Sequence, residues 1–217
     1  LDVVHYVLGV FVLLGLFGES EKEGVEMNFY FVITLLPDAE ANIGFIWQKV
    51  YGQLNLTLVA QQIERGHSAI AASYPEYGDD VFPLGSKLRL FATTSDQLQQ
   101  LNLAKWLNRL TDYTHCTSIK EVPRVGQYAR FKRVQFDSNI ERLVRRRAKR
   151  KGESLEEALM HYSGFKEQQS KLPFVNMQSL SKDCRFRLFI ELEIIEQEEE
   201  GAFSSYGLSK TATVPWF

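Results

Sequence analysis

The sequence predicts an α+β protein: an N-terminal ferredoxin-like (RRM-like) domain followed by a C-terminal α/β domain with an arginine-rich helix. Residues 27–122 show strand and helix patterns in the order β-α-β-β-α-β, and Pro123 closes this run. A strand pattern and then a strongly basic helical pattern open residues 123–217. With 45% hydrophobic and 12% aromatic residues in a chain of 217, disorder and low complexity are excluded.

The elements of the first domain follow from residue type and spacing. Residues 28–36 are β-branched and aromatic and stop at Pro37, which predicts a strand. Residues 40–62 carry apolar side chains at helical spacing and predict a helix. The same criteria predict strands at residues 67–74, 86–92 and 113–122, and a helix from Ser95 or Asp96 to Leu110. The strand at 86–92 lacks the exposed aromatic pair with which RRM sheets stack bases, so RNA binding on this sheet face is not supported.

The second domain begins with a strand at residues 127–136, followed by a helix at 138–151. Ser138 and Glu141 form a capping box at the start of this helix, and Gly152 ends it. One face of the helix is cationic, with Arg142, Arg145, Arg146, Lys149 and Arg150. The opposite face carries Ile140, Val144 and Ala148, so we expect the helix to pack on the body of the protein. A second capping box, Ser154 and Glu157, predicts a short helix to about Tyr162.

Charge is segregated along the chain. Residues 130–151 hold ten basic and two acidic side chains, a net charge of +8, while the whole chain carries −2. A dense positive segment on an acidic body is typical of a site for a polyanion, because neutralising phosphates releases counterions. A merely solvated basic helix is the alternative. Residues 191–200 hold six glutamates and predict a solvated strand end and loop.

Residues 1–26 form an apolar N-terminal extension that does not match the rest. The stretch 1–18 is almost entirely apolar, but no Lys or Arg precedes Lys22, and Met27 stands directly before the first strand. We expect the functional fold to begin at Met27, with a membrane anchor as the alternative. The two cysteines are far apart and the four histidines show no ligand spacing, so the sequence predicts a cytoplasmic protein without a metal site or cofactor.

Several blocks of the chain resemble the CRISPR-repeat endoribonucleases of type I-F systems, the Csy-type enzymes that cut precursor CRISPR RNA. The similar blocks occur in the family's order over essentially all of residues 27–217. They are LVAQ (58–61), RVQ (133–135), SNIERLVRRRAKR (138–150), LPFV (172–175), FRLFI (186–190) and FSSYGLSK…VPWF (203–217). The tail together with the arginine helix makes the resemblance specific.

The resemblance implies a partner, a repeat RNA hairpin, and an interface for it. Family members lay the arginine helix along the major groove of the hairpin, cut at its 3′ base, and stay bound to the crRNA with other subunits of a type I-F surveillance complex. By position, Arg146, Lys149 and Arg150 match groove-contacting residues. Arg133 and Gln135 match a pair that reads bases at the bottom of the stem. Phe186 matches an aromatic that stacks under the terminal base pair; core packing is its alternative role.

The resemblance also implies metal-free chemistry, in which a ribose 2′-OH attacks the scissile phosphate and leaves a 2′,3′-cyclic phosphate and a 5′-OH. Ser179, with Ser181 beside it, matches the residue that orients the 2′-OH, and Tyr206 matches an active-site tyrosine. Asn55 stands where the family has its catalytic histidine. An amide cannot accept a proton, and general acid–base catalysis is typically worth about 10²–10⁴-fold. His67 follows twelve residues later, where a surface or strand-end role is favoured over replacing that base.

Three hypotheses follow. The first is a metal-independent endoribonuclease specific for the repeat hairpin, slowed or silenced by Asn55. The second is a catalytically impaired or inactive hairpin-binding subunit of the surveillance complex. The third, a membrane-tethered protein using residues 1–18, is not favoured, and no membrane partner is expected.

Overall fold

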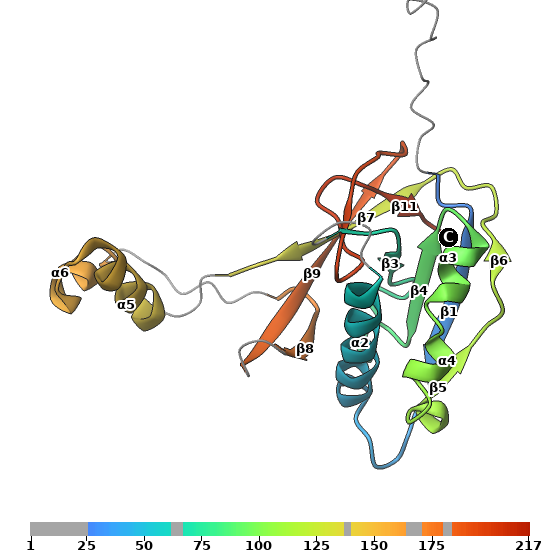
Figure 1. Ribbon diagram of the computed structural model, residues 1–217, viewed down its shortest axis with the longest axis horizontal. Coiled ribbons are helices and arrows are strands. Elements are labelled where there is room, and N and C mark those ends of the chain that lie inside the picture. Colours follow the sequence, from blue (N-terminus) through green and yellow to red (C-terminus); the bar gives the residue numbers. More distant parts are fainter. Residues whose placement is uncertain (1–25, 62–66, 137–139, 164–170, 180–183) are drawn as a thin grey trace, which may run out of the picture.

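The computed structural model describes residues 26–61, 67–136, 140–163, 171–179 and 184–217. These residues form a mixed α+β fold, as predicted, in which helix α2 lies between two larger sheets (Figure 1). The apolar extension at 1–25, the capping residue Ser138 and the candidate Ser181 lie outside the described residues. No helix among the described residues is long and apolar enough to cross a membrane.

The first sheet contains the strands predicted for residues 27–122. Its strands are β1 (Phe29–Leu35), β3 (Ala71–Ser73), β4 (Lys87–Ala92), β5 (Thr114–Cys116) and β6 (Lys120–Glu121). They pair in the order β3-β4-β1-β5, β6 also pairs with β1, and every pair is antiparallel. Alternate residues of β1 point into the core, with Phe31, Ile33 and Leu35 buried.

Helix α2 (Ile43–Ala60) begins at Asn42, whose side chain accepts a hydrogen bond from the Gly44 amide. The predicted apolar face is buried: Ile46, Trp47, Val50, Leu54 and Leu58 are each at most 2% exposed. The helix packs against strand β8 (Phe174–Gln178) of the second sheet. Helix α2 therefore connects the two sheets through its buried face.

The second sheet comprises β7 (Tyr128–Val134), β8, β9 (Arg185–Ile195) and β11 (Val214–Pro215), in the order β11-β7-β9-β8. Phe131 of β7 and Leu188 of β9 belong to the same hydrophobic cluster as Ile33 and Leu90 of the first sheet. The two halves of the chain thus share one continuous core.

Three predicted elements are divided in the structure, and one of them, the strand expected at 113–122, forms the separate strands β5 and β6. The helix expected to continue to Leu110 divides into α3 (Ser95–Gln100) and α4 (Leu103–Trp106), followed by a 3-10 turn at Thr111–Tyr113. Asn102 between them has φ +45°, which a continuous helix cannot contain. Thr94 caps α3 in a capping box with Gln97, so the prediction of Ser95 or Asp96 as the cap was wrong.

The strand expected at 67–74 is also divided. Its first part, β2 (His67–Ser68), leaves the first sheet and pairs with β10 (Phe203–Ser204) near the C-terminus. The Ser68 hydroxyl accepts a hydrogen bond from the Ile70 amide and closes the turn between β2 and β3. His67 is therefore carried away from the first sheet and placed beside Ser204.

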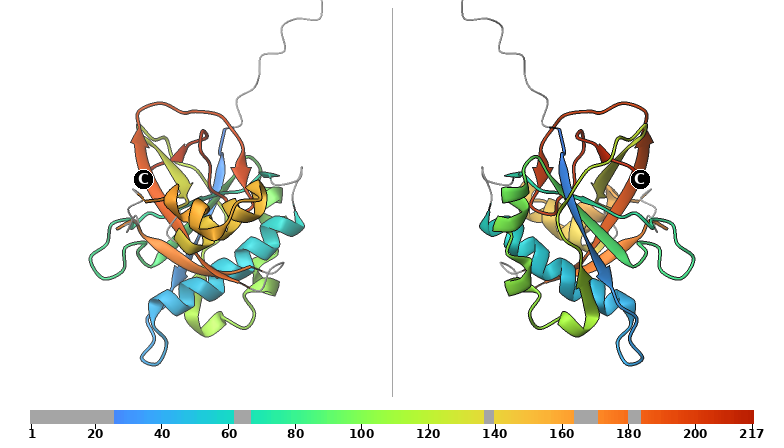
Figure 2. Two further views of the ribbon diagram at one scale, coloured as in Figure 1. Left: turned by 90° about the vertical axis from the view of Figure 1, so that its left-hand side faces the viewer. Right: turned by 90° about the vertical axis from the view of Figure 1, so that its right-hand side faces the viewer.

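Helices α5 (Ile140–Lys151) and α6 (Leu155–Met160) pack on each other (Figure 2, left) and stand apart from the sheets (Figure 1). The prediction that α5 packs on the body was wrong: Val144 is buried against α6 and belongs to no part of the main core. Gly152, with φ +70°, ends α5 as predicted. The capping box of Ser154 and Glu157 is confirmed at the start of α6.

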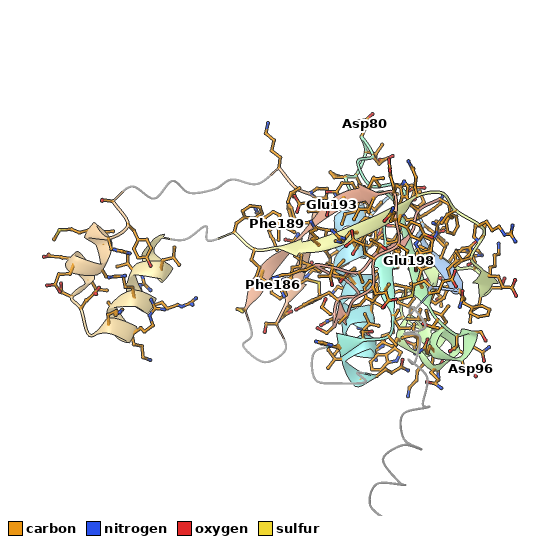
Figure 3. All side chains as sticks on the ribbon, turned by 90° about the horizontal axis from the view of Figure 1, so that it is seen from above. Asp80, Asp96, Phe186, Phe189, Glu193 and Glu198 are labelled. Atoms are coloured by element: carbon orange, nitrogen blue, oxygen red, sulfur yellow. The ribbon has the colours of Figure 1, made fainter. Side chains whose placement is uncertain are left out.

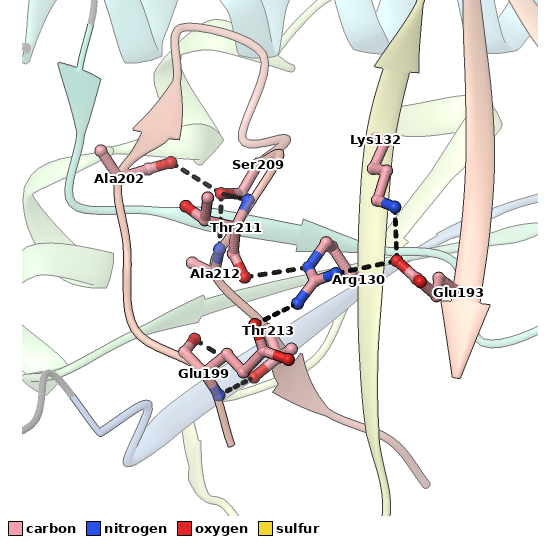
Figure 4. A network of polar contacts seen from close by, with 9 residues as sticks. All are labelled: Arg130, Lys132, Glu193, Glu199, Ala202, Ser209, Thr211, Ala212 and Thr213. Atoms are coloured by element: carbon pink, nitrogen blue, oxygen red, sulfur yellow. Dashed lines mark hydrogen bonds and ion pairs between the residues drawn. The ribbon is translucent and has the colours of Figure 1, made fainter. Parts of the chain in front are cut away.

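The glutamate-rich segment 191–200 is partly committed to an ion-pair network (Figure 4). Arg130, 8% exposed, donates to Glu193 at 2.8 Å, to Glu199 at 2.5 Å and to the Thr211 carbonyl at 2.9 Å. Lys132 lies 2.5 Å from Glu193, and its hydrogen bond, opposed by burial, lowers the pKa of that carboxyl. The expectation of a solvated strand end and loop is confirmed, because β9 ends at Ile195 and all six glutamates are exposed. Arg130 and Lys132 of the basic stretch are nevertheless neutralised by these glutamates.

Candidate nucleic-acid interface and active site

A pocket of about 680 Å³ lies beside the turn that follows β10. Residues from three separate parts of the chain form its wall, among them His67, Arg133, Gln135, Ser204, Ser205 and Tyr206. We refer to it as the Tyr206 pocket. Three residues predicted from the sequence, Arg133, Gln135 and Tyr206, therefore share one cavity with a histidine.

The turn carrying Tyr206 is fixed by its backbone. The Gly207 amide donates to the Ser204 carbonyl at 2.8 Å, and the Gly207 carbonyl accepts from the Ala72 amide of β3 at 2.8 Å. Gly207 has φ +70°, the left-handed region that favours glycine. Because Gly207 touches β3 so closely, the first sheet sets the position of Tyr206.

Two polar side chains of α2, one helical turn apart, reach this same turn. Tyr51 donates through its hydroxyl to the Tyr206 carbonyl at 2.7 Å, and the Asn55 Nδ2 donates to the Ser205 carbonyl at 2.7 Å. Tyr74 in turn donates to the Tyr51 hydroxyl at 2.7 Å. Burial raises the pKa of both Tyr51 and Tyr74, so both phenols remain protonated donors. Asn55 lies at the candidate site, with its amide engaged in holding the turn.

Arg133 lies beside two aromatic rings that contact each other. Its guanidinium carbon is 4.9 Å from the centre of the Tyr206 ring and 5.5 Å from that of Phe186. The two rings meet edge-on, with centroids 6.5 Å apart. The Arg133 Nε is buried and has no hydrogen-bond partner in the described part of the chain. A buried cationic donor without an acceptor is costly unless a ligand supplies one.

Phe186 and Ser179 come from neighbouring strands of the second sheet. Phe186 is half-buried, packs against the core, and is paired with Met177 across β8 and β9. Core packing, the alternative role considered for it, is therefore found, and its ring also meets Tyr206 edge-on. Ser179 follows β8 by one residue, and its amide donates to the Cys184 carbonyl at 2.8 Å. In Figure 3, Phe186 and Phe189 lie on the side of the body nearest α5 and α6.

The cationic face of α5 is open to solvent. Arg145, Arg146, Lys149 and Arg150 are exposed or partly exposed, while the side chain of Arg142 lies outside the described part. Arg147 instead forms a bidentate pair with Glu153, at 2.9 and 3.1 Å, which fastens α5 to the loop before α6. Arg146, Lys149 and Arg150 form no ion pair with any described carboxylate. These three side chains present their charge outward.

Comparison with known proteins decides the family. The model of the family described as CRISPR-associated protein (Cas_Csy4) matches residues 30–217. The chain belongs to the Cas_Csy4 family. It is similar to the CRISPR-associated endonuclease Cas6/Csy4 of Escherichia coli (strain UTI89 / UPEC), with 38% identity over 88% of this chain and 100% of that protein. It is 37% identical, over the same shares, to the protein of that name from Pseudomonas aeruginosa (strain UCBPP-PA14).

Among solved structures, one described as an RAMP protein binding different RNA substrates is similar to this chain. The alignment covers 87% of this chain and 100% of that one. The identity is 11% and the TM-score 0.33. This structural similarity is too low to support any argument about the site of this Cas_Csy4 chain.

The sequence missed three contributors to the site of this Cas_Csy4 chain. Tyr51 is one turn before Asn55 on α2, a spacing that could have indicated it. Ser205 lies within the FSSYGLSK block and holds Asn55. His67 was expected to have a surface or strand-end role; it does begin β2 and is exposed, but it also lines the Tyr206 pocket. No group of three or more metal-ligating side chains occurs within the described ranges.

We expect Gly207→Ala to lower the melting temperature of this Cas_Csy4 protein by about 5–10 °C, more than Gly78→Ala does. A Cβ at Gly207 would lie 2.9 Å from the Ala72 Cβ, on a backbone with φ +70°. Gly78 has φ +91° but nothing within 4 Å, so its substitution carries only the conformational cost, about 1–2 kcal/mol. Thermal unfolding of both variants measures the difference; equal melting temperatures would show that the close approach to β3 does not fix the turn.

Proposed function

We propose that this protein is a sequence- and structure-specific endoribonuclease that cuts precursor CRISPR RNA at the 3′ base of the repeat hairpin and remains bound to the crRNA. The observation that carries the proposal is the environment of Arg133, which lines an open pocket beside the Tyr206 and Phe186 rings. Its Nε is buried and has no hydrogen-bond partner among the described residues. A nucleobase or phosphate oxygen is the acceptor that such a donor lacks. The naming of the curated relatives as CRISPR-associated endonucleases supports the same activity.

RNA binding in this proposal divides between two surfaces. The exposed Arg146, Lys149 and Arg150, with Arg142 and Arg145, line the major groove of the stem. Arg133 and Gln135 read bases at the bottom of the stem, and Phe186 stacks beneath the last base pair. Other subunits of a type I-F surveillance complex are the proposed protein partners, in the cytoplasm.

The proposed chemistry needs no metal. The 2′-oxygen upstream of the scissile phosphate attacks phosphorus, and the 5′-oxygen of the next nucleotide leaves, giving a 2′,3′-cyclic phosphate and a 5′-OH. Ser179 and Ser181 orient the attacking hydroxyl, and the Tyr206 hydroxyl lies beside the reacting groups. Asn55 supports the reaction by holding the Ser205 carbonyl, and with it the turn that carries Tyr206.

We infer the domain organisation from the strand order. The order β3-β4-β1-β5 with intervening helices supports a ferredoxin-like domain at 27–122. Residues 123–217 then form the hairpin-binding domain with the arginine helix. The shared core implies that the two fold as one unit.

A second candidate function is a hairpin-binding subunit that does not cut. It is favoured by one observation: Asn55, at the position of the family's catalytic histidine, is an amide already bonded to a backbone carbonyl.

Incubating the protein with its cognate repeat transcript in EDTA separates the two candidates. The endoribonuclease gives a single cut per repeat, with a 2′,3′-cyclic phosphate on the upstream product and a 5′-OH on the downstream one, identified by end-sequencing and phosphatase sensitivity. Tight binding without a cut, at any enzyme excess, would establish the binding subunit instead.

A further inference from the structure

We propose that His67 is the general base of the cleavage reaction, taking the proton of the attacking 2′-OH in place of a histidine at position 55. The inference rests on the endoribonuclease function proposed above and names a catalytic residue for it. His67 combines two properties: its side chain is exposed, and it lines the same pocket as Arg133 and Tyr206.

The β2–β10 ladder places His67 at the site. His67 is the direct Cα partner of Ser204, and Phe203 is the partner of Ser68. Directly opposed residues of an antiparallel pair project to the same side of the ladder. The His67 imidazole therefore projects with Ser204, at the start of the turn that carries Tyr206.

Asn55 reaches the same turn from helix α2 and cannot do this work. Its Nδ2 donates to the Ser205 carbonyl at 2.7 Å, and a carboxamide has no basic nitrogen. Ser205 itself lines the pocket beside Ser204. Asn55 and His67 thus contact adjacent residues, Ser205 and Ser204, of one turn. A histidine on β2 can therefore serve as the base that position 55 does not supply.

The reaction needs a side chain that can accept a proton near neutral pH. Histidine is the side chain that ordinarily changes protonation between about pH 5 and 8. The charged and titratable side chains that share the pocket wall with it are Arg133, Lys210 and Tyr206. No carboxylate lines the pocket within the described residues.

The proton balance is complete with RNA and water. Neutral His67 accepts the 2′-OH proton as the 2′-oxygen forms its bond to phosphorus. The bond from phosphorus to the 5′-oxygen breaks, and that oxygen leaves as a hydroxyl after taking a proton from water. The imidazolium then returns its proton to the solvent, so nothing is oxidised, reduced or consumed.

The test compares His67→Ala and His67→Gln with wild type in single-turnover cleavage of the repeat transcript, alongside hairpin affinity. Gln keeps size and hydrogen bonding but accepts no proton. We expect both variants to cut about 10²–10³-fold more slowly with unchanged Kd, and added imidazole to restore part of the rate of His67→Ala. The control His115→Ala removes an exposed histidine on the edge strand β5 and should cut like wild type.

Three results would overturn the inference. If His67→Ala cuts within about threefold of wild type, His67 is not the base, although the endoribonuclease function stands. If the variants are slow but imidazole gives no rescue, and the rate of His67→Ala still rises between about pH 5 and 7 as in wild type, His67 has only a structural role. If wild type itself never cuts, the proposed function and the inference both fail.

Discussion

Replacing Arg146, Lys149 and Arg150 together by alanine is expected to weaken binding of the repeat hairpin about 10²–10⁴-fold near physiological salt. All three side chains lie on α5 and form no ion pair with a described carboxylate. Their charge is therefore available to RNA. Every cation that no longer meets a phosphate also lowers the slope of log K against log salt by about one unit, so the slope should fall by about three.

A matched control removes the same charge elsewhere. Lys105, Lys120 and Arg124 are exposed basic residues outside α5. Alanine at all three changes the net charge equally and should leave affinity within about threefold of wild type, apart from a weak long-range effect. Fluorescence anisotropy across a salt series compares the two variants. Equal losses of affinity would mean that the net charge, and not the α5 surface, attracts the RNA.

The α5 variant should also melt at the wild-type temperature. Its three positions lie on the cationic face of the helix, while Val144 and the Arg147–Glu153 pair, which join α5 to its surroundings, are retained. A fall in melting temperature together with affinity would mean that the weaker binding reflects unfolding of α5 and α6.

The residue pattern predicted most of the secondary structure because helices, caps and strands depend mainly on interactions between residues close in the sequence. The apolar spacing of 40–62 and the capping box at Ser154 are properties of a few neighbouring residues, and both are found. The breaks were not predictable in this way. Asn102 adopts a left-handed backbone that no local pattern demanded. Strand β2 leaves the first sheet because β10, from the other end of the chain, offers it a partner.

Site residues could be predicted where the family resemblance supplied their positions. Residues that reach the site only through tertiary contacts could not be predicted. Arg133, Gln135 and Tyr206 were expected to be functional, and the structure gathers them at one pocket. His67 was assigned a surface or strand-end role because no neighbouring residue in the sequence indicates a site. Its place at the pocket depends on the pairing of β2 with β10, in which it lies opposite Ser204. Helix α5 was expected to pack on the body because its apolar face requires a packing partner. The sequence does not identify that partner, and in the structure it is α6.

Replacing Arg133 by methionine is expected to weaken hairpin binding about 10–100-fold while leaving the melting temperature unchanged within about 3 °C. The free protein then lacks two cation–π interactions, at 4.9 and 5.5 Å, worth about 0.5–1 kcal/mol each at such sites. The substitution also removes the buried Arg133 Nε, which has no hydrogen-bond partner among the described residues and whose burial costs about 1–3 kcal/mol. These two effects are opposite in sign and similar in size, so the free energy of unfolding barely changes.

Arg130, three residues earlier on β7, gives the opposite pattern and serves as the control. Its guanidinium is fully engaged with Glu193, Glu199 and the Thr211 carbonyl, so it has nothing to offer RNA. Arg130→Met should lower the melting temperature by several degrees yet leave the affinity of the folded protein unchanged. Calorimetry and anisotropy on both variants complete the comparison. If Arg133→Met melts well below wild type, its guanidinium has an acceptor in the free protein and is not held ready for RNA.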